Sequence, residues 1–306
     1  MRIISQFASL ALMAGGASFS TACRMTQVMP DEHAGHTTAS GGNVGMTTGS
    51  QNPGLPAGQL DAKARLAASP RHAEWVMVAT GVTPTDSVRA WVVYPERKTK
   101  APVVVVIHEI FGLSPWIRSV ADQLAADGFI AIAPDLLTSK NVPGSPLDPN
   151  PDSARAVIGS LDQGVVQRQI TAVANYAMAF PSAAKSYGIV GYCWGGGVSF
   201  AHAVAAGDRL GASVVYYGVS PAPEKLGSVR APVIGFYGEN DNRVNSTIPP
   251  ADSTLKAMGR TFEHNIMPGA GHGFLRAQEG ANGANMEATR KAWPATIAWF
   301  RHHLKA

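Results

Sequence analysis

The stretch GIVGYCWGGG at residues 188–197 carries the strongest signal for the fold of this 306-residue chain. Its apolar first half is typical of a strand, and the glycines that follow mark a sharp turn into a helix. Its core matches the nucleophile elbow G-x-S-x-G, with Cys193 in the place of serine. The elbow presents its central side chain at a helix amino terminus, where thiolate is favoured over thiol. The stretch therefore indicates a cysteine nucleophile rather than a buried structural cysteine.

Strand and helix signals alternate on both sides of this turn. Runs rich in β-branched and aromatic residues predict strands at 74–80, 88–94, 102–107, 129–133, 186–192, 212–217, 232–237 and 261–267. Helices are predicted at 116–126, 153–180, 195–206, 250–258 and 286–303, the second weakened by Gly159 and Gly164. Pro134 is expected to end the fourth strand. The pattern predicts an α/β fold: a mostly parallel sheet with helices on both faces and an antiparallel amino-terminal hairpin.

Two polar residues in loops downstream complete a catalytic triad with Cys193. In this type of fold the chain order is nucleophile, acid, histidine. His272 lies in a glycine-rich loop directly after the strand 261–267, unlike the other downstream histidines, which fall in a helix, in a strand or at the terminus: His202, His264, His302 and His303. Asp241 follows the strand 232–237, and its G-x-x-D spacing favours it over its competitor Glu239.

The motif HEIFG at residues 108–112 follows the buried strand 102–107 and is expected to form an oxyanion loop. One oxyanion donor is then the backbone N–H of Trp194, directly after the nucleophile, and the other is that of Ile110. Glu109 is unusual beside a prospective oxyanion, since a carboxylate would repel it. We expect Glu109 either to face solvent or to contact Cys193 or His272 when no substrate is bound.

The amino terminus has the pattern of an export signal. A positive start, an apolar run and small residues before Cys23 predict a signal at 1–23 rather than a membrane-spanning or buried helix. The small residues before Cys23 resemble the bacterial lipoprotein signal, although plain cleavage is the alternative. Residues 24–70 are predicted to be a flexible tether, in which His33 and His36 are solvated, and 71–306 the catalytic domain.

Composition narrows the class of function. The formal net charge is only +4 and no basic block occurs, so a nucleic-acid partner has little support. The two cysteines, Cys23 and Cys193, exclude a disulfide-rich scaffold, and no C-x-x-C pair suggests zinc. Hydrophobic residues make up 45% of the chain, which is enough for a substantial core. Since the sequence offers no metal motif and the chemistry of the triad needs no helper group, we expect no metal and no cofactor.

Six motifs, in order, resemble those of the dienelactone hydrolase family of α/β-hydrolases over residues 88–304: HEIFG at 108–112, PDL at 134–136, PGSPLDP at 143–149, GYCWGG at 191–196, YYG at 216–218 and GHGF at 271–274. The resemblance implies the α/β-hydrolase fold and a triad of Cys193, Asp241 and His272. It also implies that the cysteine attacks an ester or enol-lactone and that the acyl-enzyme is then hydrolysed.

The same resemblance assigns roles to two charged residues. It implies that Glu109 interacts with the resting nucleophile, and that Arg276 is one of two arginines that hold a substrate carboxylate. The stretch 136–141, where the second arginine is expected, contains none. Lys140 stands there instead, and as a point charge it cannot reproduce a planar bidentate grip.

The sequence thus predicts a cysteine-dependent hydrolase of small carboxylic esters or lactones that acts as a monomer. Its partner is a small-molecule substrate, and a membrane is involved only through a lipid on Cys23. Export places the protein in a bacterial periplasm or on a membrane as a lipoprotein. Two alternatives stay open: acyl or thioester transfer by the same triad, and a non-catalytic ligand-binding protein on the same fold.

Overall fold

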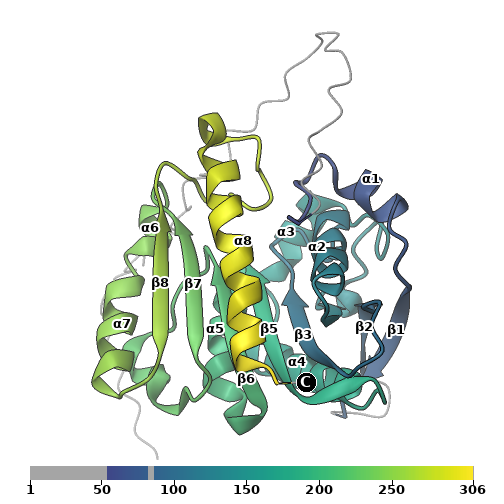
Figure 1. Cartoon of the computed structure of the whole chain (residues 1–306), viewed down its shortest axis with the longest axis horizontal. Helices are drawn as coiled ribbons and strands as arrows, with labels where there is room; N and C mark the ends of the chain where they lie inside the picture. The colour runs from purple at the N-terminus through teal and green to yellow at the C-terminus, as the bar shows by residue number, and fades with distance from the viewer. Residues whose placement is uncertain (1–53, 82–85, 306) are drawn as a thin grey trace, which may run out of the picture. The chain divides into compact units, whose positions relative to one another are not determined.

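The computed structural model describes residues 54–81 and 86–305 and contains, in that part of the chain, one sheet (Figure 1). The strand order is β1-β2-β4-β3-β5-β6-β7-β8. The strands are β1 Ala73–Ala79, β2 Ser87–Val93, β3 Ala101–Ile107, β4 Ile130–Asp135, β5 Ala183–Tyr192, β6 Leu210–Tyr216, β7 Val233–Gly238 and β8 Phe262–Met267. Strand β2 pairs antiparallel with both neighbours, and all other pairs are parallel. The predicted fold class, including the antiparallel hairpin, is confirmed.

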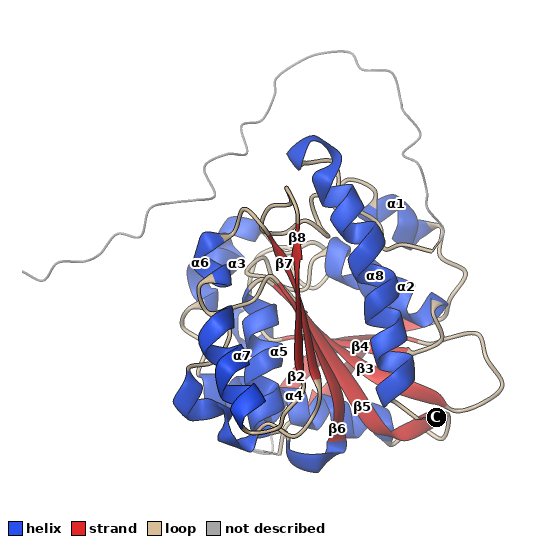
Figure 2. Cartoon of the chain, turned by 60° about the vertical axis from the view of Figure 1, so that its left-hand side comes forward, coloured by secondary structure: helices blue, strands red, loops and turns tan. Residues whose placement is uncertain are grey.

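Helices cover both faces of the sheet (Figure 2). One face carries α1 Ala62–Ala67, α2 Pro115–Ala126 and α8 Ala284–His303, and the other carries α4 Gln163–Met178, α5 Trp194–Ala205 and α7 Ile248–Ala257. Two shorter helices follow β4 and β7: α3 Pro151–Ile158 and α6 Asn242–Asn245. The 3-10 turns of the described residues are η1 Thr138–Lys140, η2 Gly207–Arg209, η3 Pro223–Ser228 and η4 Ala281–Gly283.

The strand β3 shows how the two faces are built. Every residue from Ala101 to Ile107 is buried. Successive side chains point to opposite faces of a strand, so Val103 and Val105 pack on the α4 and α5 side, whereas Val104 and Val106 pack on the α2 and α8 side. Burial of one such valine contributes about 1.5–3 kcal/mol. A continuous apolar run is therefore what a central strand with two covered faces requires.

One predicted strand end differs from the structure, and one predicted helix is divided in two. Strand β4 runs through Pro134 to Asp135 instead of ending before the proline. Its pairing with β3 stops at Ile132, so the missing proline N–H leaves no gap in that ladder. The helical region 153–180, which Gly159 and Gly164 weaken in the sequence, is divided after Gly159. A new helix starts where the Asp162 side chain accepts the N–H of Val165.

The domain begins earlier than predicted, because residues 54–69 of the predicted tether pack against it. Leu55 and Ala57 are buried, and α1 lies beside α2. The Arg71 guanidinium forms an ion pair with Asp122 on α2, which is itself almost fully buried. The remainder of the tether and the predicted export signal, with Cys23, His33 and His36, lie outside the described residues.

Candidate active site

The predicted elbow is present between β5 and α5. Cys193 has φ 57° and ψ −118°, a left-handed conformation that is costly for a side chain other than glycine. Its N–H donates to the carbonyl of Tyr216 at 3.0 Å, which holds the turn against the neighbouring strand β6. A Cβ atom on Gly191 would lie 1.9 Å from the backbone oxygen of Gly195. The turn is therefore closed so tightly that only glycine fits at this position.

The structure joins the predicted base to the predicted acid. His272 follows β8 and Asp241 follows β7, and Nδ1 of the histidine donates to a carboxylate oxygen of Asp241 at 2.6 Å. This bond directs Nε2 away from the carboxylate, and Nε2 has no hydrogen-bond partner among the described residues. The competing carboxylate, Glu239, accepts the N–H of Gly269 at 2.8 Å and so braces the loop instead.

The imidazole of His272 has a raised pKa. Burial opposes its protonation, but the hydrogen bond to Asp241 and the interaction with Cys193 raise its pKa to about 10. His202 differs: it is buried in α5 between Tyr187 and Gln167, and burial lowers its pKa to about 4.

The raised pKa of His272 predicts a pH-dependent stability. Folding raises this pKa from the usual 6.5 to about 10, so the stabilisation is fully present below pH 6.5 and is lost as the pH rises to about 10. Chemical denaturation across this range should show the free energy of unfolding falling. The decline should be smaller in Asp241→Asn, which removes the largest interaction that raises this pKa. An equally steep decline in that variant would contradict the assignment.

The expected oxyanion donors belong to two segments in close contact. A Cβ on Gly195 would lie 2.4 Å from the carbonyl oxygen of His108, so the loop after β3 packs directly on the start of α5. The N–H groups of Ile110 and Trp194 donate no hydrogen bond within the described residues. Two free N–H groups from adjacent segments are what stabilisation of an oxyanion requires.

His108 is a residue whose role the sequence did not reveal. Its Nδ1 donates to the carbonyl of Glu109 at 2.7 Å. The carbonyl of Glu109 and the N–H of Ile110 belong to the same peptide group. Because this group is trans, the carbonyl and the N–H point in opposite directions. The ring also stacks on Trp194, with centroids 5.6 Å apart. The fully buried His108 therefore fixes both expected donors. The sequence offered only its position in the HEIFG motif.

Glu109 does not face solvent. Its side chain is 4% exposed, and an oxygen of its carboxylate lies 2.9 Å from Nε of Arg276. Burial raises the pKa of Glu109, while Arg276 and then His272 oppose that rise. The ion pair offsets the repulsion that a carboxylate would exert on a nearby oxyanion. The structure thus joins Glu109 to Arg276, a pairing that the sequence analysis did not include.

Arg276 lies between the two loops of the site. Its guanidinium stands over the ring of Phe111, 5.0 Å from the centroid, and one of its terminal nitrogens reaches the turn at Gly273, beside His272. On α3, Arg155 also stands over Phe111, at 5.7 Å, and was not singled out from the sequence. Lys140 lies in η1, and no hydrogen bond or ion pair joins it to the triad within the described residues.

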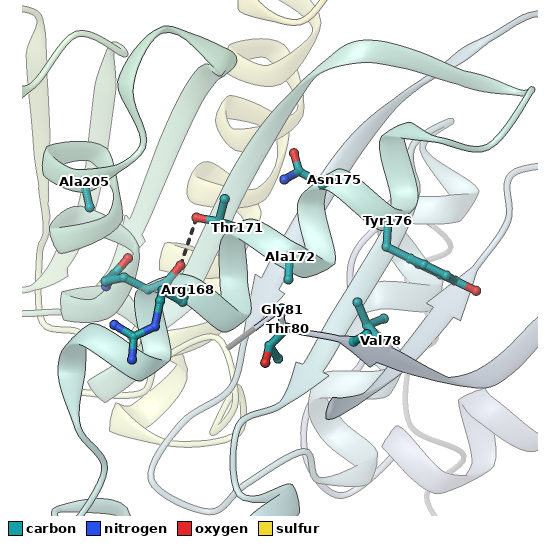
Figure 3. A pocket seen from close by; sticks show the side chains of 11 residues that line it. Val78, Thr80, Gly81, Arg168, Thr171, Ala172, Asn175, Tyr176 and Ala205 are labelled. Atoms are coloured by element: carbon teal, nitrogen blue, oxygen red, sulfur yellow. Dashed lines mark hydrogen bonds between the residues drawn. The ribbon is translucent and has the colours of Figure 1, made fainter. Parts of the chain in front are cut away.

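A cavity lies away from the triad. It measures about 780 Å³ and is lined by α4, the end of β1 and Ala205 at the end of α5 (Figure 3). Along α4, the Thr171 hydroxyl donates to the carbonyl of Gln167 at 2.9 Å. No triad residue lines this cavity. Within the described residues, no cluster of three metal-ligating side chains occurs, and no helix is long and apolar enough to cross a bilayer.

Comparison with known proteins gives a consistent result. The model of the dienelactone hydrolase family matches residues 88–304. A carboxymethylenebutenolidase of a Pseudomonas strain is 32% identical over 65% of this chain and 83% of its own. A candidate carboxymethylenebutenolidase of Salmonella typhimurium is 27% identical, over 81% of this chain and 96% of its own. The crystal structure of a candidate dienelactone hydrolase from Klebsiella pneumoniae superimposes with a TM-score of 0.64 at 26% identity, covering 75% of this chain and 99% of that one.

Proposed function

Because the chain belongs to the dienelactone hydrolase family, a family of carboxylic ester hydrolases, we propose that it hydrolyses small esters or lactones through an acyl-thioester on Cys193. The observation that carries this proposal is the hydrogen bond of 2.6 Å between His272 and Asp241, downstream of a cysteine in a strained elbow. This arrangement supplies a nucleophile, a proton carrier and an orienting acid.

The reaction begins with attack by the Cys193 sulfur on the carbonyl carbon. The electron pair of the carbonyl moves to its oxygen, where the N–H groups of Ile110 and Trp194 stabilise the negative charge. Collapse of this intermediate expels the alcohol or enol oxygen, which takes the proton of His272. An acyl-thioester remains on Cys193.

The second half of the reaction releases the acid. His272, now neutral, accepts a proton from a water molecule that attacks the thioester carbon. Expulsion of the thiolate breaks the carbon–sulfur bond and restores the ion pair of Cys193 with His272. Asp241 keeps the imidazole oriented in both halves and stabilises its protonated form.

Capture of the intermediate tests this mechanism. Brief incubation with p-nitrophenyl acetate followed by acid quenching should add one acetyl group to the peptide that contains Cys193, as read by mass spectrometry. Treatment with hydroxylamine should remove it, because thioesters are labile to this nucleophile. Acetylation elsewhere, or none despite release of p-nitrophenol, would refute a thioester on Cys193. Transfer of the acetyl group to an added thiol in preference to water would favour acyl transfer instead.

We also propose that the protein is exported and that a lipid on Cys23 anchors it to a membrane. The proposal rests on the sequence of residues 1–23. Bacteria that express the full chain should incorporate labelled palmitate into the protein, and Cys23→Ser should abolish the label. Recovery of the unmodified protein from the cytoplasm would contradict both claims.

A further inference from the structure

A short segment before α1 lies on the active-site loops. Residues 55–59, called here the amino-terminal strap, lie outside the region 88–304 that the family model matches. The indole N–H of Trp116 on α2 donates to the carbonyl of Ala57, and the amide of Gln278 donates to that of Pro56, both at 3.0 Å. The N–H of Gln59 donates to the carbonyl of Arg276 at 2.8 Å. The strap thus fastens to the loop that carries His272.

The side chain of Gln59 then engages the guanidinium of Arg276. Nη1 of the arginine donates to the amide oxygen of Gln59, while Nε lies 2.9 Å from the carboxylate of Glu109. The amide nitrogen of Gln59 donates to the carboxylate of Glu279 at 3.4 Å, which orients the amide oxygen toward the arginine. Arg276 is therefore held by an acid from the oxyanion loop and by an amide from the strap.

The contacts with Glu109 and Gln59 restrict how Arg276 can bind a carboxylate ligand. A guanidinium has two edges that grip a carboxylate with two parallel N–H groups: one formed by Nε and one Nη, the other formed by both Nη atoms. Nε on the first edge is buried and lies 2.9 Å from the carboxylate of Glu109 without a hydrogen bond to it, so this edge is closed to a substrate. On the second edge, Nη1 donates to Gln59. A substrate carboxylate can then reach single donors only, and it loses the planar bidentate grip.

We propose that Gln59 is a specificity-determining residue: by covering the terminal edge of Arg276, it directs the enzyme toward uncharged esters and lactones and away from substrates that carry a carboxylate. This inference rests on the proposed function, because it names the substrate class of the same site. The residue that selects the substrate then lies in the amino-terminal strap, outside the residues that the family model matches.

The test compares two substrates in matched variants. We expect Gln59→Ala to raise the ratio of kcat/KM for a carboxylated enol-lactone to kcat/KM for p-nitrophenyl acetate about tenfold, the effect of one hydrogen bond to a charged group. The rise should come mainly from a lower KM for the lactone. Gln59→Glu, of similar size, should lower the ratio. Leu60→Ala, a change at an exposed neighbour on the same segment, should leave it unchanged.

A double variant and a binding measurement complete the test. In the Arg276→Gln background, Gln59→Ala should no longer change the ratio. By calorimetry, benzoate should bind Gln59→Ala more tightly than the unaltered protein, with uncharged benzamide unaffected. A ratio that falls or stays constant in Gln59→Ala overturns the proposal. If the unaltered protein hydrolyses neither substrate, the proposed function fails, and equal benzoate affinities would overturn the role of Gln59 separately.

Discussion

Replacement of Cys193 by alanine is expected to lower kcat/KM for p-nitrophenyl acetate by about 10⁴-fold or more, the scale measured when a triad nucleophile is removed. The thiolate is the group that forms the bond to carbon, so its loss leaves only the oxyanion donors and substrate binding. These contacts cannot replace the nucleophile, because the bond between sulfur and the substrate carbon can no longer form. The measurement is initial rates of p-nitrophenol release by both proteins at several substrate concentrations.

The control is the fold of the variant. Cys193 is only partly buried, and alanine removes a single heavy atom from it. The thermal midpoint of Cys193→Ala should therefore stay close to that of the unaltered protein. The same rates measured with His272→Ala should be similarly low, because residues that act as a unit are not additive. Retention of a tenth or more of the activity in folded Cys193→Ala would refute the cysteine mechanism.

Gly191→Ala is expected to have the largest effect on stability. The new Cβ would lie 1.9 Å from the backbone oxygen of Gly195 and 2.4 Å from its carbonyl carbon. Backbone atoms cannot rotate away as a flexible side chain can, so β5 and α5 must separate. We expect the free energy of unfolding to fall by about 4 kcal/mol or more, and the thermal midpoint by about 10 °C.

Gly159→Ala is the matched control for this change. Gly159 ends α3 with φ −66°, an ordinary helical value, and nothing lies within 4 Å of a Cβ built there. Its substitution should change the free energy of unfolding by no more than about 0.5 kcal/mol. Equal stability of the two variants in thermal and denaturant unfolding would mean that the elbow is not closed as described.

Local pattern is sufficient for the elements that a single segment defines. The apolar run of β3 indicates a strand covered on both faces, and the glycines around Cys193 specify a tight turn, whatever lies around them. The break after Gly159 follows from local propensity in the same way. The course of β4 through Pro134 was predicted wrongly, because the ladder with β3 ends at Ile132 while β2 continues to pair with β4 as far as Asp135.

The positions of the charged groups depend on segments that are distant in the sequence. Arg276 lies 167 residues after Glu109 and 217 after Gln59, the difference of their residue numbers, yet it contacts both. Each contact depends on how the loops after β3 and β8 and the amino-terminal strap meet on one edge of the domain. The packing of residues 54–69 on α2 was missed for the same reason, since Ala57 and Ser69 bond to Trp116 and Asp122 on that helix.

The sequence by itself determined the family, the α/β fold class and the candidate triad, because each depends on short motifs in a fixed chain order. Only the tertiary structure decided that His272 pairs with Asp241 rather than Glu239, that His108 orients the oxyanion loop, and that Glu109 binds Arg276. The physical reason is that a hydrogen bond or an ion pair depends on distances of about 3 Å between atoms. Such distances arise only when the strands are aligned in one sheet and their carboxyl-terminal loops converge.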